Sequence, residues 1–135
     1  MVKCFQVNWD VNADDFAAML AKSLAKAAAI LNAANYYPVG MITGFAEKAQ
    51  EDVRAMFIAL FDETREVYER IDAFKRKSQF LLERYGNGAV QHYQHENAIF
   101  AYLWLRYPDK YYLYKLNEIK AISNKLESSY TFKKG

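Results

Sequence analysis

The sequence has little of several residue types that would point to a particular chemistry. Its 135 residues include one cysteine, two prolines, two histidines and five glycines. An intrachain disulfide needs two thiols, so the single residue Cys4 excludes one and fits a reducing compartment. A zinc site needs at least three well-placed ligands, which His92 and His95 alone do not supply.

Long apolar runs are also absent. The longest weakly polar stretch, FAAMLAKSLAKAAAILNAA, is interrupted by Lys22 and Lys26 and does not resemble a membrane span. The start, MVKCFQVNWD, lacks the apolar h-region of a secretory signal. We therefore expect a cytoplasmic protein without a membrane partner.

The composition is that of a globular chain, with 53% hydrophobic, 25% charged and 16% aromatic residues, eleven of them tyrosines. The length suits one domain over residues 1–135, with 131–135 as a linker. The charge is unevenly distributed: residues 1–105 carry eleven Lys/Arg against thirteen Asp/Glu, and residues 106–135 carry seven against three. The basic end is therefore the C-terminal one.

Hydrophobic periodicity predicts a mainly α fold. The alternation in CFQVNW suggests a short strand. A helix follows, with Asn12 as N-cap, Asp14 and Asp15 in its first turn, and Pro38 after its end. Its apolar stripe comprises Phe16, Leu20, Leu24, Ala27, Leu31 and Ala34.

The clearest pattern runs from Phe45 to Tyr85, where apolar positions recur every three or four residues. It predicts either one long helix or two helices broken near Asp62, with Gly86 at the C′ position. The stripe comprises Phe45, Ala49, Val53, Met56, Leu60, Thr64, Val67, Ile71, Phe74, Ser78, Leu81 and Tyr85.

The remaining segments complete the predicted fold. GAVQHYQHE should be a loop, residues 96–106 a helix buried on nearly all sides, KYYLYK a short strand, and KLNEIKAISNKLESSY a last amphipathic helix. Together the segments predict a helical bundle with a long helix or helical hairpin and at most a small β element.

The motifs give no catalytic constellation. GMITGFAEK has glycines at 40 and 44 but no P-loop lysine. In HYQHE, solvated loop histidines are preferred over a metal site. Glu66 and Arg70 are spaced i, i+4 in the favourable order and are expected on a solvated helix face. We expect no enzyme activity and no cofactor.

Two segments are candidates for nucleic-acid binding. The first is KRK, comprising Lys75, Arg76 and Lys77, to which Arg70 and Arg84 add charge. The second is RYPDKYYLYK, from which we select Arg106, Lys110, Tyr112 and Lys115. Cations neutralise phosphates, and exposed tyrosines stack on unpaired bases. Tyr111 is instead expected on the core side.

The chain also resembles a known family, through VRAMFIALFDET at 53–64 and LRYPDKYYLYK at 105–115. Between about Phe45 and Lys120 it is similar to the region N-terminal to the AAA+ motor in McrB-type subunits of modification-dependent restriction systems, which act in phage defence. In such systems the motor uses GTP or ATP, forms a ring and works with a nuclease subunit. N-terminal regions there commonly recognise DNA.

The resemblance implies a fragment without the motor's Walker motifs, and so without nucleotide hydrolysis of its own. One hypothesis is a DNA-recognition domain. A second is an adaptor that docks on the AAA+ motor, another protomer or the nuclease subunit, so that self-association is possible. A stand-alone enzyme ranks last.

Overall fold

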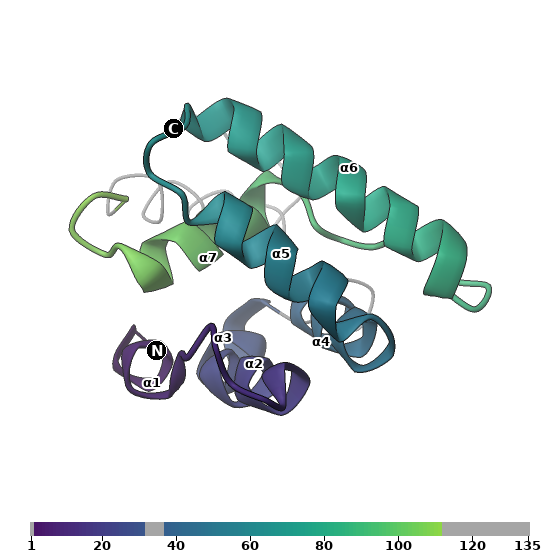
Figure 1. The fold of residues 1–135 in the computed structure, drawn as a ribbon, viewed down its shortest axis with the longest axis horizontal. Coiled ribbons are helices and arrows are strands. Elements are labelled where there is room, and N and C mark those ends of the chain that lie inside the picture. The colour runs from purple at the N-terminus through teal and green to yellow at the C-terminus, as the bar shows by residue number, and fades with distance from the viewer. Residues whose placement is uncertain (1, 32–36, 112–135) are drawn as a thin grey trace, which may run out of the picture.

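A computed structural model describes residues 2–31 and 37–111 of the chain. The described residues form seven helices and no strand (Figure 1), which confirms the mainly α, helical-bundle prediction. In chain order these are α1 (Val2–Asn8), α2 (Phe16–Ser23), α3 (Ala25–Leu31), α4 (Pro38–Lys48), α5 (Gln50–Leu60), α6 (Val67–Tyr85) and α7 (Glu96–Arg106). None of the helices in this part of the chain is long and apolar enough to cross a bilayer.

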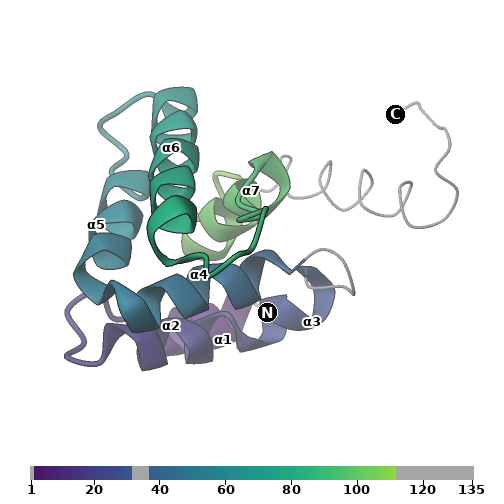
Figure 2. The same ribbon diagram turned by 90° about the vertical axis from the view of Figure 1, so that its right-hand side faces the viewer.

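The helices form two levels. Helices α1 to α4 form the lower level, and α5, α6 and α7 rise above it (Figure 2). Helix α1 is joined to α7 across almost the whole chain, because the Gln6 side-chain amide donates to the backbone carbonyls of Leu105 and Arg106. The first and last described helices therefore close the bundle.

An aromatic cluster centred on Phe57 forms the middle of the core. Phe57 is fully buried. Its ring centroid lies 5.2 Å from that of Phe74 on α6, 5.5 Å from Tyr102 on α7 and 5.6 Å from Trp9. Ring pairs at these separations are attractive beyond the area that they bury. One residue of α5 thus holds together elements from both levels.

The strand expected at residues 5–9 is wrong, because this segment is helical through Asn8. Phe5 and Trp9 fit a period of two but also lie four apart, which places both on one helix face. Their rings stack with centroids 5.0 Å apart. Val7, which alternation would bury with them, is 72% exposed. Phe5, Val7 and Trp9 are too few apolar positions to distinguish the two-residue period of a strand from the 3.6-residue period of a helix.

The helix expected after Asn12 starts later and is interrupted. Asp15, not Asn12, is the N-cap, and its carboxylate accepts from the backbone N–H of Ala18 at 3.1 Å. The helix is interrupted at Leu24, between α2 and α3. The helical hydrogen bonding continues into α3, because the Leu24 carbonyl accepts from the Ala28 N–H at 2.9 Å. The predicted stripe from Phe16 to Leu31 is buried. Ala34 lies outside the described residues.

The stripe from Phe45 to Tyr85 spans three helices. The break near Asp62 is confirmed, because the Asp62 carboxylate accepts from Thr64 N–H at 3.1 Å and caps a turn between α5 and α6. A second break lies at Ala49, with φ −142° and ψ 62°. Pro38 occupies the first turn of α4, where its missing N–H costs nothing. Residues 32–36, where the preceding helix was predicted to end, lie outside the described residues.

The C-terminal end of α6 differs from the prediction in detail. Gly86 is the C-cap, with φ −69°, and the left-handed residues are Asn87 and Gly88. Glycine is nevertheless needed at 86, because an added Cβ would lie 2.3 Å from the Leu82 carbonyl oxygen. The buried helix predicted for 96–106 is confirmed as α7. In the predicted strand KYYLYK, Lys110 and Tyr111 lie in a turn after α7, where their N–H groups donate to the Tyr107 carbonyl. The rest of that segment and the predicted last helix lie outside the described residues.

The space around Gly44 gives a stability prediction. Gly44 lies inside α4, and a Cβ added there would meet no atom within 4 Å. We expect Gly44→Ala to raise the free energy of unfolding by about 0.5–1 kcal/mol, because alanine loses less backbone entropy on folding. Urea unfolding measures the change. Gly86→Ala is the matched control and should destabilise; a less stable Gly44→Ala protein would contradict the argument.

Candidate functional site

The cations predicted at KRK do not form one patch. Lys75 points toward α7, where its Nζ lies 2.7 Å from the Glu96 carboxylate. Lys77 points toward α5, with its Nζ 3.8 Å from Asp52. Arg76 pairs with Asp72 on its own helix. Successive helix positions differ by about 100° in direction, so the three side chains diverge.

Two of the cations predicted at RYPDKYYLYK are described, with Arg106 as the last residue of α7 and Lys110 just after it. The Arg106 guanidinium lies over the Tyr107 ring, 4.5 Å from its centroid. Lys110 is in a turn and pairs with Glu63 from the α5–α6 connection. Tyr112 and Lys115 lie outside the described residues.

Arg70 is not solvated, contrary to the prediction for the Glu66–Arg70 face. It is 4% exposed, and its guanidinium makes four hydrogen bonds. It donates to the Leu60 carbonyl at 2.6 Å and to the Arg65 carbonyl at 3.0 Å. It also donates to Glu63 Oε2 and to the Tyr111 hydroxyl, each at 3.0 Å.

Glu66 is likewise not a partner of Arg70. Its carboxylate caps α6 by accepting from the N–H groups of Tyr68 at 3.1 Å and Glu69 at 3.0 Å. A cation at i+4 would have been the favourable surface arrangement. Glu66 instead caps the exposed start of α6, and the Arg70 side chain is buried in the core.

Glu63 joins the buried arginine to the end of α7. Its Oε2 accepts from the Tyr111 hydroxyl at 3.0 Å as well as from Arg70. Burial alone would raise the pKa of Glu63, but hydrogen bonds from Lys110, Tyr111 and Arg70 outweigh it, and the pKa is lowered. The carboxylate is therefore held ionised. Tyr111 is 2% exposed, as its predicted core-side position requires.

The solvated-histidine prediction is wrong for His92, which is 6% exposed. Its Nδ1 accepts from Gln94 N–H at 2.8 Å across Tyr93, which has a φ of 63°. Gln94 is fully buried and donates to the Pro38 carbonyl at 2.7 Å. The loop histidine therefore helps to hold a left-handed turn against α4. Among the described residues, no group of three or more His, Cys, Asp or Glu side chains could hold a metal ion.

The later half of α6 carries an exposed aromatic-cationic strip, which we define as Lys77, Phe80 and Arg84. Phe80 is 44% exposed. Lys77 Nζ lies 4.7 Å from the centroid of its ring, and Arg84 Cζ lies 5.9 Å from it. None of the ion pairs among the described residues involves Arg84. The strip thus combines an accessible ring with an available guanidinium.

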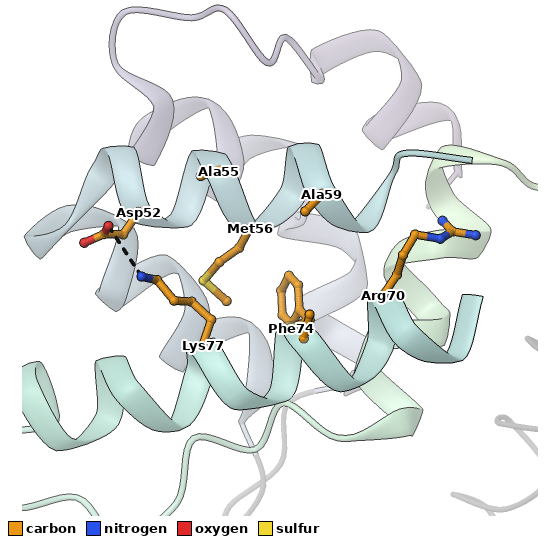
Figure 3. A pocket seen from close by; sticks show the side chains of 8 residues that line it. Asp52, Ala55, Met56, Ala59, Arg70, Phe74 and Lys77 are labelled. Atoms are coloured by element: carbon orange, nitrogen blue, oxygen red, sulfur yellow. Dashed lines mark ion pairs between the residues drawn. The ribbon is translucent and has the colours of Figure 1, made fainter. Parts of the chain in front are cut away.

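An apolar groove of about 220 Å³ lies between α5 and α6 and reaches the strip at Lys77 (Figure 3). Met56 and Phe74 line its middle, and the Lys77–Asp52 pair and Arg70 lie at its two ends. Its walls also include three alanines, Ala55, Ala59 and Ala73. Small side chains leave room here for another apolar group. Ile58, also on α5 but not in the groove lining, has a side chain that is 53% exposed.

Sequence reasoning missed Phe80 and the role of Arg70. Phe80 lies off the apolar stripe and has cations three residues before and four after it, which is a visible signal for an exposed aromatic residue. The sequence indicates the burial of Arg70 but not its partner. Arg70 follows Val67 at the spacing of the buried face, but nothing local reveals that Tyr111, 41 residues later, is its partner.

Comparisons with protein-family models, with curated proteins and with solved structures find no match to this chain.

The buried position of Arg70 predicts a large effect of its loss. Arg70→Met keeps the length and apolar stem but leaves two carbonyls and the Tyr111 hydroxyl without their donor. We expect a loss of about 3 kcal/mol in the free energy of unfolding, the lower end for breaking a buried pair, because Glu63 keeps other donors. Urea unfolding measures it.

The matched control is Arg65→Met. Arg65 is an exposed neighbour whose nearest carboxylate, on Glu69, is 3.8 Å away. Exposed pairs of this kind contribute little, so the change should be under about 0.5 kcal/mol. Equal effects of the two substitutions would show that Arg70 does not anchor the α5–α6 turn.

His92 predicts a dependence of stability on pH. Burial, with the nearby charges of His95 and Lys75, lowers the pKa of His92 from 6.5 to about 4. Its contribution is therefore complete above pH 6.5, and it is lost as the pH falls from 6.5 toward 4, because only the unfolded chain takes up the proton there. The expected slope is about 1.4 kcal/mol per pH unit within this window.

Urea unfolding at several pH values between about 7 and 5 measures this slope. His92→Asn keeps an acceptor near the position of Nδ1 but cannot titrate, so its profile should be flatter over the same range. His95→Asn should keep most of the slope, because burial is the largest cause of the lowered pKa. The same slope in wild type and His92→Asn would refute the assignment.

Proposed function

We propose that this chain is a non-catalytic N-terminal domain of a McrB-like restriction motor and that it contacts DNA through the later half of α6. The observation that carries the proposal is the exposed strip of Lys77, Phe80 and Arg84. The resemblance of residues 53–64 and 105–115 to the region before such motors supplies the biological setting.

The charge of this half-helix supports an anionic partner. Residues 75–85 carry four cations, namely Lys75, Arg76, Lys77 and Arg84, against the single carboxylate of Glu83. Binding to DNA is driven largely by cations that replace the counterions of phosphates. A basic stretch next to an exposed aromatic ring offers both charge and stacking.

The ion pairs already present do not prevent such contacts. The Arg76–Asp72 side chains are 69% and 59% exposed, and Lys77–Asp52 are 40% and 46% exposed at 3.8 Å. Exposed pairs contribute only about 0–1 kcal/mol, so a phosphate can compete with either carboxylate. Lys75 is less available, because its contact with Glu96 ties α6 to α7.

The RYPDKYYLYK segment has a lesser part in the proposal. Within its described portion, Tyr111 is buried and Lys110 is held by Glu63. Arg106 is half-buried, and its guanidinium lies over the Tyr107 ring, so it must reach a ligand from that position. Tyr112 and Lys115 stay predicted contacts that mutation can test.

A second candidate is an adaptor that docks on the motor region, another protomer or a nuclease subunit. The apolar α5–α6 groove and exposed Ile58 favour it, because exposed apolar surface of this kind serves protein contacts. In an adaptor that docks through this groove, the strip of Lys77, Phe80 and Arg84 would not contact the partner.

The proposal predicts salt-dependent DNA binding. Replacing both Lys77 and Arg84 by Gln should weaken the affinity and reduce the slope of log affinity against log salt by about two, one per lost phosphate contact. Fluorescence anisotropy with labelled duplex, methylated duplex and single-stranded DNA measures both quantities. Replacing both Lys22 and Lys26 by Gln is the charge-matched control; both are exposed and lie on α2 and α3, in the lower level of the bundle.

The control should bind like the wild type. Absence of binding to all three DNA forms at low salt would refute the proposal and leave the adaptor as the better candidate. An equal loss in the double control variant and in the strip variant would show that only net charge matters.

A further inference from the structure

The positions of the three strip residues place them on one face of α6. Lys77, Phe80 and Arg84 are spaced i, i+3 and i+7, which repeats on a single helix face. The two cations are separated by about 10 Å along the axis. Phe80 lies between them and is 44% exposed, whereas Ser78 and Leu81, on the buried face of the same helix, are 0% exposed. Core packing therefore does not explain why residue 80 is aromatic.

An aromatic ring between two cations suits one part of DNA in particular. Phosphates meet the cations, and the flat face of a base stacks on the ring. Base-aromatic stacking tolerates any base, because each has a π face. The contact needs a base that is not already stacked on both sides by its neighbours in a duplex.

The other end of α6 argues against insertion into a duplex groove. In helices that read the major groove, the N-terminal residues contact the base edges. Here the N-terminal turn carries carboxylates, with Glu66 as the cap and Glu69 inside the first turn. Glu63 lies beside it. This acidic end would repel phosphates, while the basic strip lies in the second half of the helix.

We propose that the strip binds an unpaired stretch of DNA, with one base stacked on Phe80 and the phosphates on either side of it contacted by Lys77 and Arg84. This rests on the proposed DNA contact of α6 and names the form of DNA that α6 takes. Lys77 leaves its loose 3.8 Å contact with Asp52 to reach the strand.

The test uses the full chain and fluorescence anisotropy with two probes, a labelled oligothymidylate and the same strand annealed to its oligodeoxyadenylate complement. Wild type should bind the single strand more tightly. Phe80→Leu, which keeps apolar bulk without a π face, should weaken single-strand binding about tenfold and leave duplex binding unchanged. Phe80→Trp should restore it, and the fluorescence of the added indole should be quenched when the single strand binds.

A matched aromatic control is Tyr68→Leu, at the other end of the same helix. Tyr68 is 56% exposed, and its ring packs edge-on against Phe100 on α7. The variant should keep the wild-type preference for single strands. Far-UV circular dichroism and urea unfolding of each variant establish that it is folded, so a loss of affinity reports on the contact itself.

The outcomes separate this inference from the proposed function. Tighter binding of the duplex, or an equal loss on both probes in Phe80→Leu, overturns single-strand stacking but leaves DNA binding in place. Binding of neither probe overturns both. Weaker single-strand binding that Phe80→Trp does not restore also overturns the stacking contact.

Discussion

The arrangement of the upper level depends on one buried cation, Arg70. Its guanidinium bonds to the end of α5 through the Leu60 carbonyl, to the α5–α6 turn through Arg65 and Glu63, and to Tyr111 after α7. Removing a guanidinium from water is costly unless its N–H groups find acceptors. Here four do, so the position is stable only when the three segments meet as they do in this fold.

This anchor divides α6 into two halves with different surroundings. The first half is fixed by Arg70, by the Glu66 cap and by the aromatic contact of Phe74 with Phe57. The second half buries Ser78 and Leu81 but presents Phe80 outward. A rigid first half keeps the exposed strip at a constant place on the molecule. Preorganisation of this kind lowers the cost of ordering side chains when a ligand binds.

Local sequence patterns predicted the helices better than their partners. The Phe45–Tyr85 stripe identified most of the buried face across three helices, because apolar spacing reports burial directly. Its member Thr64 is instead exposed, in the turn between α5 and α6. Its breaks were only partly visible: Asp62 carries turn chemistry, whereas Ala49 carries none. Arg70 was assigned to solvent because arginine is usually exposed, and His92 because it lies in a loop. Their burial depends on partners such as Tyr111, and local patterns do not show which distant residues meet.

The contact of α1 with α7 has a consequence for how the chain is made. Gln6 bonds to the carbonyl of Leu105, 99 residues later. A ribosome adds about 5–20 residues per second, so α1 waits on the order of 5–20 seconds before its partner helix emerges. During that interval Trp9 can contact Phe16 on α2 and then Phe57 on α5, and both Phe5 and Trp9 can contact Phe61 just after α5. The α1–α7 contact therefore forms only after the other five described helices have been made.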